Sequence, residues 1–234
     1  SINGRVSELK TDNLRVILNN FNAKLANPFL AIYGVSISGI ATGESNFAGL
    51  LSQPGISSDM FIKDLGVYRD TLGDAKINFN YKISEKLITV HALVDRGGIK
   101  NIEVEGKYYI NTKNDSIDID ITLQKTNLTS FAGYVKGIFS DVKGKASGKL
   151  KLSGPAKSPE LVGKIRLQQT SFVVDYLNTK YNFADEVEFT PNYFRFNKIT
   201  INDANGNQAI VDGYIYHQKL KDFILNFDIQ ADNF

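Results

Sequence analysis

The sequence has no cysteine and no tryptophan, and it has a single methionine among its 234 residues. Without cysteine the chain has neither a disulfide framework nor a thiol nucleophile. This absence does not fix the compartment, because a bacterial envelope protein and a cytosolic protein can both lack cysteine. The sequence also lacks any apolar run close to the roughly 20 residues that a membrane-spanning helix needs.

The sequence also lacks an excess of either charge, because it has 27 basic and 25 acidic residues. The lysines are spread over solvent positions of strand patterns, whereas phosphate binding needs clustered Lys and Arg, so we expect no nucleic-acid partner. The sequence contains no Gly-rich phosphate loop, no HExxH and no GxSxG pattern. We therefore expect a protein that is not an enzyme and that has no cofactor.

Two stretches of the chain resemble each other at an offset of 105 to 108 positions. The matching positions, in pairs, are Gly39 and Gly144, Gly43 and Gly148, Pro54 and Pro159, Gly106 and Gly213, and Asp120 and Asp228. Such a repeat is one supersecondary unit that stacks on its neighbour. We expect a first β-repeat unit over residues 1–139 and a second over residues 140–234, joined in one continuous elongated sheet. The pattern starts and stops abruptly and shows no signal peptide at Ser1, so we interpret the sequence as a fragment of a longer protein.

Most of the chain alternates between apolar and polar residues, which is the pattern of half-buried β-strands. Turn signals such as Pro54-Gly55, Gly97-Gly98 and Asn205-Gly206 separate the runs. This spacing predicts about twelve strands that pair as an antiparallel meander. Phe194 and Ile199 lie in opposite phases of one run, which predicts a bulge near Asn197.

Two segments have helical spacing instead, and each precedes a Gly-spaced strand. The first helix is predicted near residues 13–25, from Leu14, Ile17, Leu18, Phe21 and Leu25. The second is predicted near residues 128–139, from Leu128, Phe131, Ala132, Val135 and Phe139.

One face of every predicted strand is apolar, yet only these two short helices are available to cover it. A flat sheet of this length would expose too much apolar surface, so the sheet needs a second layer, closure into a barrel, or curling into a trough. Inward-facing glycines, which permit sharp bending, favour the trough; they are Gly39, Gly106, Gly163 and Gly213. We therefore predict an all-β fold: an elongated, curled antiparallel sheet that forms an open trough with an apolar groove and two short amphipathic helices.

The candidate site is the lining of this groove. The residues predicted to line it are Ile77, Phe79, Tyr81, Ile102, Val104, Ile117, Ile119, Ile121, Ile165, Leu167, Phe194, Phe196, Val211, Ile215, Leu225, Phe227 and Ile229. No catalytic residue and no metal ligand is assigned.

The two histidines, His91 and His217, both lie within strand patterns and have no Ser or carboxylate at a recognisable spacing. We interpret them as wall positions of the sheet. Asp118 and Asp120 are two residues apart and therefore share a face, which we interpret as the solvent side of a strand with an all-Ile opposite face.

The segment 203–207 reads DANGN, which resembles the start of a calcium loop. Such a loop ends with Glu at its twelfth position, where this sequence has Tyr214. We therefore predict an Asn-Gly hairpin turn at this segment.

The second repeat also contains sequence segments that resemble a known family. Residues 144–154 read GKASGKLKLSG, residues 159–167 read PELVGKIRL, residues 172–183 read FVVDYLNTKYNF and residues 201–213 read INDANGNQAIVDG. The order and spacing of these segments resemble the TamB family (AsmA-like translocation and assembly module proteins) in its Bacteroidetes form. The resemblance covers most of residues 140–234 and extends more loosely over the first repeat.

This resemblance implies a β-taco segment, which is a curled sheet with an apolar groove, within a periplasm-spanning protein. In the full-length protein it implies an anchor in the inner membrane and a TamA-like outer-membrane barrel as partner. It also implies a role in outer-membrane protein assembly and in carrying phospholipids between the two membranes.

We expect phospholipid acyl chains as the cargo, because an apolar groove gains about 0.8 kcal/mol for each buried methylene. The alternative is a scaffold or chaperone for outer-membrane proteins or autotransporters, which would bind unfolded strands by edge pairing. A third possibility is a closed β-sandwich that binds glycan, which would need exposed aromatic residues on the polar face. The sequence does not separate the first two.

Overall fold

A computed structural model describes residues 1–31, 35–67, 70–110, 113–134, 137, 139–219 and 221–231. In this part of the chain, fifteen strands form one sheet, in which each strand neighbours the next in chain order except that β12 pairs with β10 and β13. The prediction of an all-β fold built on one antiparallel sheet is thus confirmed. Among the described residues, no helix has the length and apolar character needed to cross a membrane.

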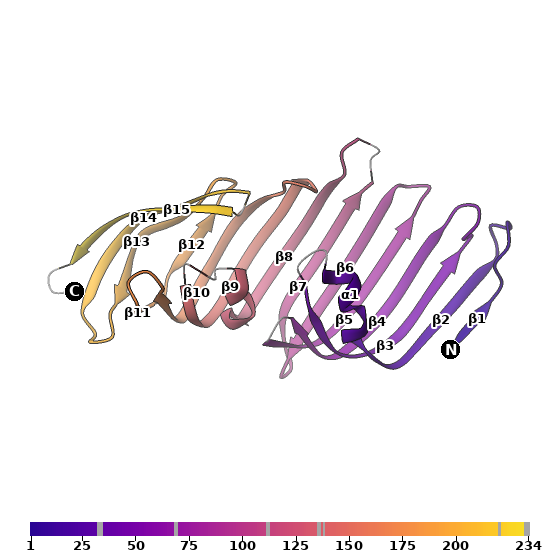
Figure 1. Cartoon of the computed structure of the whole chain (residues 1–234), viewed down its shortest axis with the longest axis horizontal. Helices are drawn as coiled ribbons and strands as arrows, with labels where there is room; N and C mark the ends of the chain where they lie inside the picture. The colour runs from indigo at the N-terminus through magenta and orange to yellow at the C-terminus, as the bar shows by residue number, and fades with distance from the viewer. Residues whose placement is uncertain are drawn as a thin grey trace. The chain divides into compact units, whose positions relative to one another are not determined.

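The strands fall in chain order along the sheet (Figure 1). The first eight are β1 (Ile2–Gly4), β2 (Asn13–Asn22), β3 (Ile37–Ala48), β4 (Gly55–Val67), β5 (Asp70–Lys82), β6 (Leu87–Arg96), β7 (Ile99–Tyr109) and β8 (Ser116–Asn127). The next seven are β9 (Phe139–Pro155), β10 (Glu160–Val174), β11 (Thr179–Phe183), β12 (Glu186–Phe189), β13 (Tyr193–Asn202), β14 (Gln208–Gln218) and β15 (Lys221–Ala231). The helical elements are the 3-10 helices η1 (Ala23–Ala26) and η3 (Leu128–Tyr134) and the one-turn helix α1 (Asn27–Leu30).

The chain folds as two compact units. Unit 1 comprises residues 1–120 and 153–157, and unit 2 comprises residues 121–152 and 158–234. In both units the alternation of apolar and polar residues gives the sheet one apolar and one polar face, because successive side chains of a strand point to opposite faces.

Strands β2 to β7 of unit 1 pair antiparallel, and their bulges fall at nearly the same level of the sheet. β2 is irregular between Leu18 and Phe21, β4 between Ile62 and Leu65, and the β6–β7 pair just after Val94. A bulge bends its strand and increases the local twist. Bulges aligned across neighbouring strands therefore bend the whole sheet along one line, which we call the crease.

Residues at the crease are the most buried part of unit 1. A row of small and branched side chains crosses the strands there, and its buried members are Ala41, Ile62, Ala75, Val94 and Ile102. Ala75 is fully buried, at 0% exposed. Gly39 lies next to the crease with φ of 124°, a backbone conformation that requires glycine, as the prediction of glycine-assisted bending anticipated.

The predicted helix near residues 13–25 is wrong. Residues 13–22 form β2, in which Leu18 lies opposite Gly43 of β3 and the strand bulges before Phe21. Asn20, within the bulge, has φ of 53°. Because the bulge inserts one residue into a period-two pattern, it gives Leu14, Leu18 and Phe21 the four- and three-residue spacing of a helix. Helical structure begins only at Ala23, with η1 and α1.

The second predicted helix, near residues 128–139, is shorter than expected. Residues 128–134 form the 3-10 helix η3, and Phe139 is already the first residue of β9. Val135 of the predicted pattern lies outside the described residues. A 3-10 segment connecting two strands is a common use of this helix type.

Unit 2 has a compact apolar core on one face of its strands. Its buried residues are Phe183, Val187, Ile199, Ile201, Ala209 and Val211. The predicted bulge near Asn197 is confirmed, since the β13–β14 register shifts between Phe196 and Ile199, and Lys198 has φ of 50°. This bulge keeps Phe196 and Ile199 on the same apolar face although they are three residues apart.

Candidate functional site

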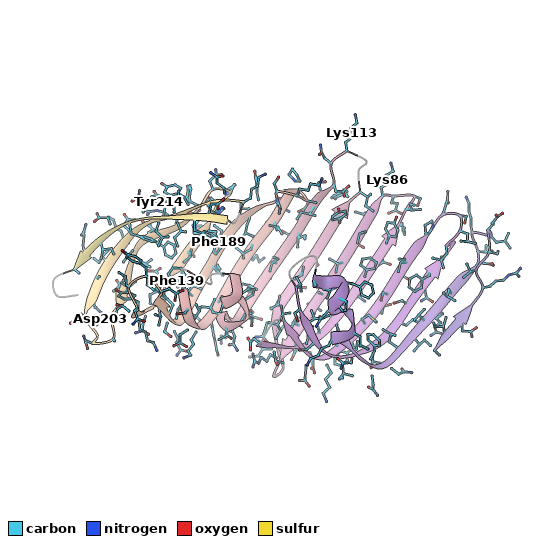
Figure 2. All side chains as sticks on the ribbon, viewed as in Figure 1. Lys86, Lys113, Phe139, Phe189, Asp203 and Tyr214 are labelled. Atoms are coloured by element: carbon cyan, nitrogen blue, oxygen red, sulfur yellow. The ribbon has the colours of Figure 1, made fainter. Side chains whose placement is uncertain are left out.

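The apolar face of unit 1 is a set of rows that continue from strand to strand. One row contains Ile77 of β5, Ala92 of β6 and Val104 of β7, which are successive register partners. The neighbouring row contains Phe79, Val90 and Gly106. The first row continues as Met60 of β4, Gly43 of β3 and Leu18 of β2. The second row continues through Ser58 and Ser45, whose hydroxyls hydrogen-bond to each other, to Val16 of β2. Figure 2 shows the side chains on these strands.

Away from the crease this apolar face is half-exposed. Ile77, Phe79, Tyr81, Val90 and Val104 are all intermediate in exposure, in contrast to the buried crease residues of the same strands. Side chains in this position pack against their neighbours in the row but retain apolar surface that no other part of unit 1 covers. Such surface is available to an apolar ligand.

The structure brings the predicted groove residues of unit 1 onto this one face. Ile102 lies at the buried crease, and Ile117 and Ile119 on β8 are half-exposed. Ile119 lies over Gly106, where an added β-carbon would be 3.4 Å from the Ile119 Cγ1 atom and 2.7 Å from Val90 Cγ1. Glycine at position 106 therefore leaves the space that the Val90 and Ile119 side chains occupy.

The predicted groove residues of unit 2 also share one face. One row runs from Ile165 of β10 through Val187 and Phe196 to Gly213 and Phe227. Other predicted residues lie in adjacent rows or pack against the core; they are Leu167, Phe194, Val211, Ile215, Leu225 and Ile229. Ile121, on β8, is half-exposed.

This second apolar face is aromatic and closely packed. The ring of Phe172 lies 5.0 Å from that of Phe139 and 5.6 Å from that of Phe183, both in edge-to-face geometry. Phe189 and Phe194 have ring centroids 4.7 Å apart. Such ring pairs add about 0.5–1.5 kcal/mol each beyond the area that they bury. The face is buried at Phe183 and Val187, whereas the rings packed around them are intermediate in exposure. It is most exposed at β15, where Leu225 is 45% and Ile229 is 54% exposed.

His217 belongs to this aromatic packing. Its ring centroid lies 4.7 Å from that of Phe194 and 6.2 Å from that of Phe223, and the residue is buried. Burial lowers the pKa of His217 below its usual value, because an apolar environment disfavours the charged imidazolium, and a hydrogen bond at the Thr190 backbone opposes this only in part. The sequence placed His217 on the wall of the sheet, and the structure adds that it is an uncharged member of the core.

Several residues of the two faces were missed by sequence reasoning. In unit 1 they include Leu14, Val16 and Leu18, which the helix prediction removed from the sheet, and Ile56, Met60 and Ile88. In unit 2 they include Phe172, Phe183, Val187, Phe189, Ile199 and Ile201. In β2 a bulge broke the phase of the alternation, whereas Ile56, Met60 and Ile88 lie in stretches of regular register where the alternation is intact.

The opposite face of unit 1 is polar and contains a hollow of about 280 Å³. The hollow is lined by side chains of β5 to β8, among them Asn78, His91, Glu105, Lys107, Asp118 and Asp120. His91 Nε2 lies 3.5 Å from Glu103 Oε1, and Glu105 is its direct cross-strand partner. Asp118 and Asp120 lie on this polar side, as the sequence predicted, whereas carboxylates next to His91 were not predicted.

The polar face of unit 2 carries a tyrosine and arginine cluster. The Arg195 guanidinium lies 4.4 Å from the ring centroid of Tyr214, pairs with Asp212 at 2.5 Å and donates to the carbonyls of Phe196 and Gly213. Tyr214 stacks on Tyr216 with ring centroids 5.6 Å apart. Tyr214 therefore lies on the face opposite to Phe189, and both are labelled in Figure 2. These contacts join β13 to β14 and already use the polar groups of Arg195.

The segment 203–207 is a turn closed by its own aspartate. Asp203 Oδ1 accepts hydrogen bonds of 2.8 Å from the backbone amides of Asn205 and Asn207, and Oδ2 accepts one from the Asn207 side chain. Burial alone would raise the pKa of Asp203, but these hydrogen bonds outweigh it and lower the pKa. The carboxylate is thus used within the turn, in agreement with the predicted Asn-Gly turn.

Comparison of the chain with protein-family models, with curated proteins and with solved structures finds no match in any of the three.

Proposed function

We propose that the chain is a non-enzymatic segment of a periplasmic bridge, in which the apolar sheet face lines a groove that carries phospholipid between the inner and outer membranes. The observation that carries this proposal is the continuous, half-exposed apolar face of unit 1, with rows such as Ile77, Ala92 and Val104. The sequence resemblance to the TamB family supports the same reading, with a TamA-like outer-membrane barrel as the partner of the full-length protein and an anchor in the inner membrane.

The apolar character of these rows on β5 to β7 suits an acyl chain. Acyl chains need apolar contact along their length and no directional polar partner, and each methylene removed from water gains about 0.8 kcal/mol. The rows of unit 1 offer aliphatic side chains without any charged residue between Ile77, Phe79 and their register partners on β6 and β7. A lipid held in this way can move along the rows, because successive positions offer the same kind of contact.

A photo-cross-linking amino acid placed at Ile119 and, separately, at Asp120 tests the proposal in cells that contain the full-length protein. Ile119 lies on the apolar face against Gly106, whereas Asp120 is exposed on the opposite side of the same strand. We expect phospholipid adducts at position 119 and none at position 120, as read by mass spectrometry. Lipid at both positions or at neither would overturn the proposal.

A substitution complements this measurement. Ile119→Glu places a charge on the half-exposed apolar face, which an acyl chain cannot cover without a large desolvation cost. We expect the loss of lipid adducts at a second reporter on the same face, such as position 79, with the circular dichroism spectrum retained. The matched control Ile119→Leu keeps the apolar surface and should keep the adducts. Unchanged adducts in Ile119→Glu would contradict the proposal.

The alternative function is a scaffold that assists the assembly of outer-membrane proteins by strand pairing. One observation favours it: within the described residues, β15 has β14 as its strand partner, with Ile224 66% exposed on one face and Ile229 54% exposed on the other. An edge strand with exposed apolar residues can accept another strand. Polypeptide adducts along β15, in place of lipid adducts at position 119, would favour this function.

A further inference from the structure

The polar face of unit 1 brings three metal-ligating side chains together across two strands. His91 of β6 is the register partner of Glu105 of β7, and Glu103 lies two residues earlier on the same face of β7. The imidazole and carboxylate ligand atoms of these three residues all lie within 4.8 Å of one another. We propose that His91, Glu103 and Glu105 bind a divalent first-row transition-metal ion, for which zinc is the test ion.

The distances fit one ion after a small adjustment of side chains. Zinc lies about 2.0–2.1 Å from imidazole nitrogen and about 2.0–2.2 Å from carboxylate oxygen, so two ligand atoms of one ion are at most about 4.3 Å apart. The distance from His91 Nε2 to Glu103 Oε1, 3.5 Å, is already within this limit. The side chains of His91 and Glu103 are 40% and 45% exposed, so rotation of the glutamates can close the remaining gap without displacing the sheet.

The ligand set also indicates the class of ion. One imidazole with two carboxylates is the donor chemistry of zinc and its first-row neighbours, whereas calcium and magnesium sites use oxygen ligands alone. Three protein ligands leave one position of a tetrahedral ion open. His91 and Glu105 also line the hollow of about 280 Å³, which has room for a further ligand. Water or a small anion can therefore complete the coordination.

Electrostatics at this place favours a cation. Glu103 and Glu105 carry like charges on one face of one strand, and Asp118 and Asp120 contribute further carboxylates to the rim of the hollow. Like charges this close to one another repel. Lys107 is the basic residue that lines the hollow. An ion bound by His91 and both glutamates relieves this repulsion and links β6 to β7.

The register explains why the site was not visible in the sequence. A two-residue turn at Gly97-Gly98 pairs Arg96 with Ile99 and would, without a bulge, place His91 opposite Val104. The irregularity after Val94 shifts the register by one residue and places His91 opposite Glu105 instead. The bulge that helps to form the crease therefore also assembles this cluster.

The experiment uses histidine-ring nuclear magnetic resonance of the tag-free chain, titrated with zinc. The sequence has only two histidines, so each ring signal is assigned by comparison with a single variant, His91→Gln. We expect zinc to shift the ring signals of His91 and to leave those of His217 unchanged, because His217 is buried among phenylalanine rings. The absence of a shift at His91 in millimolar zinc would overturn the proposal.

Variants of the two glutamates distinguish a three-ligand zinc site from zinc binding to the His91 imidazole alone. Loss of an outer-shell partner weakens metal sites about 10- to 100-fold, and loss of a direct ligand should cost at least as much, so we expect Glu103→Gln and Glu105→Gln each to weaken zinc binding by about tenfold or more. The matched control is Glu44→Gln, which should leave zinc affinity unchanged. Glu44 lies on the same register row as His91 but three strands away, at a distance of about 14 Å. Equal zinc affinity in Glu103→Gln, Glu105→Gln and the unaltered chain would overturn the proposal.

Discussion

The two units use the same alternation of apolar and polar residues to build two different surfaces. Away from its crease, unit 1 presents mostly aliphatic, half-exposed rows such as Ile77, Ala92 and Val104. Unit 2 presents phenylalanine rings that pack on one another, with Phe183 and Val187 buried. Periodicity therefore determines which face is apolar, whereas side-chain size and the surrounding contacts determine whether that face remains available to a ligand.

This difference assigns different roles to the two faces. A face whose rings pack on one another at distances near 5 Å has part of its apolar surface covered within the unit. A face that is half-exposed gains further free energy when an apolar ligand covers it. We therefore expect unit 1 to be the better place for acyl chains and the packed part of unit 2 to contribute stability.

The largest expected effect comes from removing one ring from each face. Phe183→Ala, in the packed core of unit 2, should destabilise the chain by about 3–5 kcal/mol, because it removes buried surface and leaves a cavity. Phe79→Ala, on the half-exposed face of unit 1, should cost about 1–2 kcal/mol, since part of its surface is already in water. Urea unfolding followed by circular dichroism measures both. Equal losses would mean that the two faces are packed alike.

A pH titration provides a smaller effect that is specific to unit 2. Burial lowers the pKa of His217 in the folded chain, so the unfolded chain, with an ordinary pKa of about 6.5, binds a proton more readily. The stability contributed by His217 is complete above about pH 6.5 and is lost as the pH falls from there toward the lowered folded-state pKa.

Two variants isolate this contribution in urea unfolding midpoints measured from pH 7 to pH 5. His217→Phe should flatten the pH dependence, because phenylalanine suits the ring cluster and does not titrate. Asn78→Gln, on the polar face of unit 1, changes no titrating group and should leave the pH dependence in place. A slope that is the same in His217→Phe and in the unaltered chain would contradict the assignment.

The smallest expected effect concerns the bulges, which the two units share. Lys198 in unit 2 and Asp64 in unit 1 have φ of 50° and 53°, a conformation that costs a residue with a β-carbon about 1–2 kcal/mol. Glycine removes this cost but loses about 0.5–1 kcal/mol in chain entropy. Lys198→Gly and Asp64→Gly should therefore each raise stability by up to about 1 kcal/mol. Thermal unfolding measures both, and a lowered midpoint in either would contradict the bulge assignment.

The sequence predicted the fold class and the side of most strands, because alternation depends only on the backbone period. Ile77, Phe79 and Tyr81 lie on one face for this reason alone. The prediction of secondary structure from the sequence failed at residues 13–22, where the bulge at Asn20 gave a strand the spacing of a helix.

The cluster around His91 shows a second kind of limit. Glu103 and Glu105 follow His91 by 12 and 14 residues, and His91 lies opposite Glu105 because the β6–β7 register shifts by one residue after Val94. The difference between a buried and a half-exposed apolar row is likewise set by partners on other strands. Both features depend on contacts between residues far apart in the chain, which a local pattern does not encode.

The crease of unit 1 has a consequence for how such a sheet can grow. A closed barrel fixes its number of strands, since closure links strand number to tilt and stagger. In unit 1 individual strands instead produce the bend, by one-residue insertions near Phe21 of β2, Ile62 of β4 and Ile102 of β7. A duplicated hairpin that brings its own insertion at the same level would lengthen the sheet and keep its cross-section, so length can change through gene duplication without redesign of the curvature.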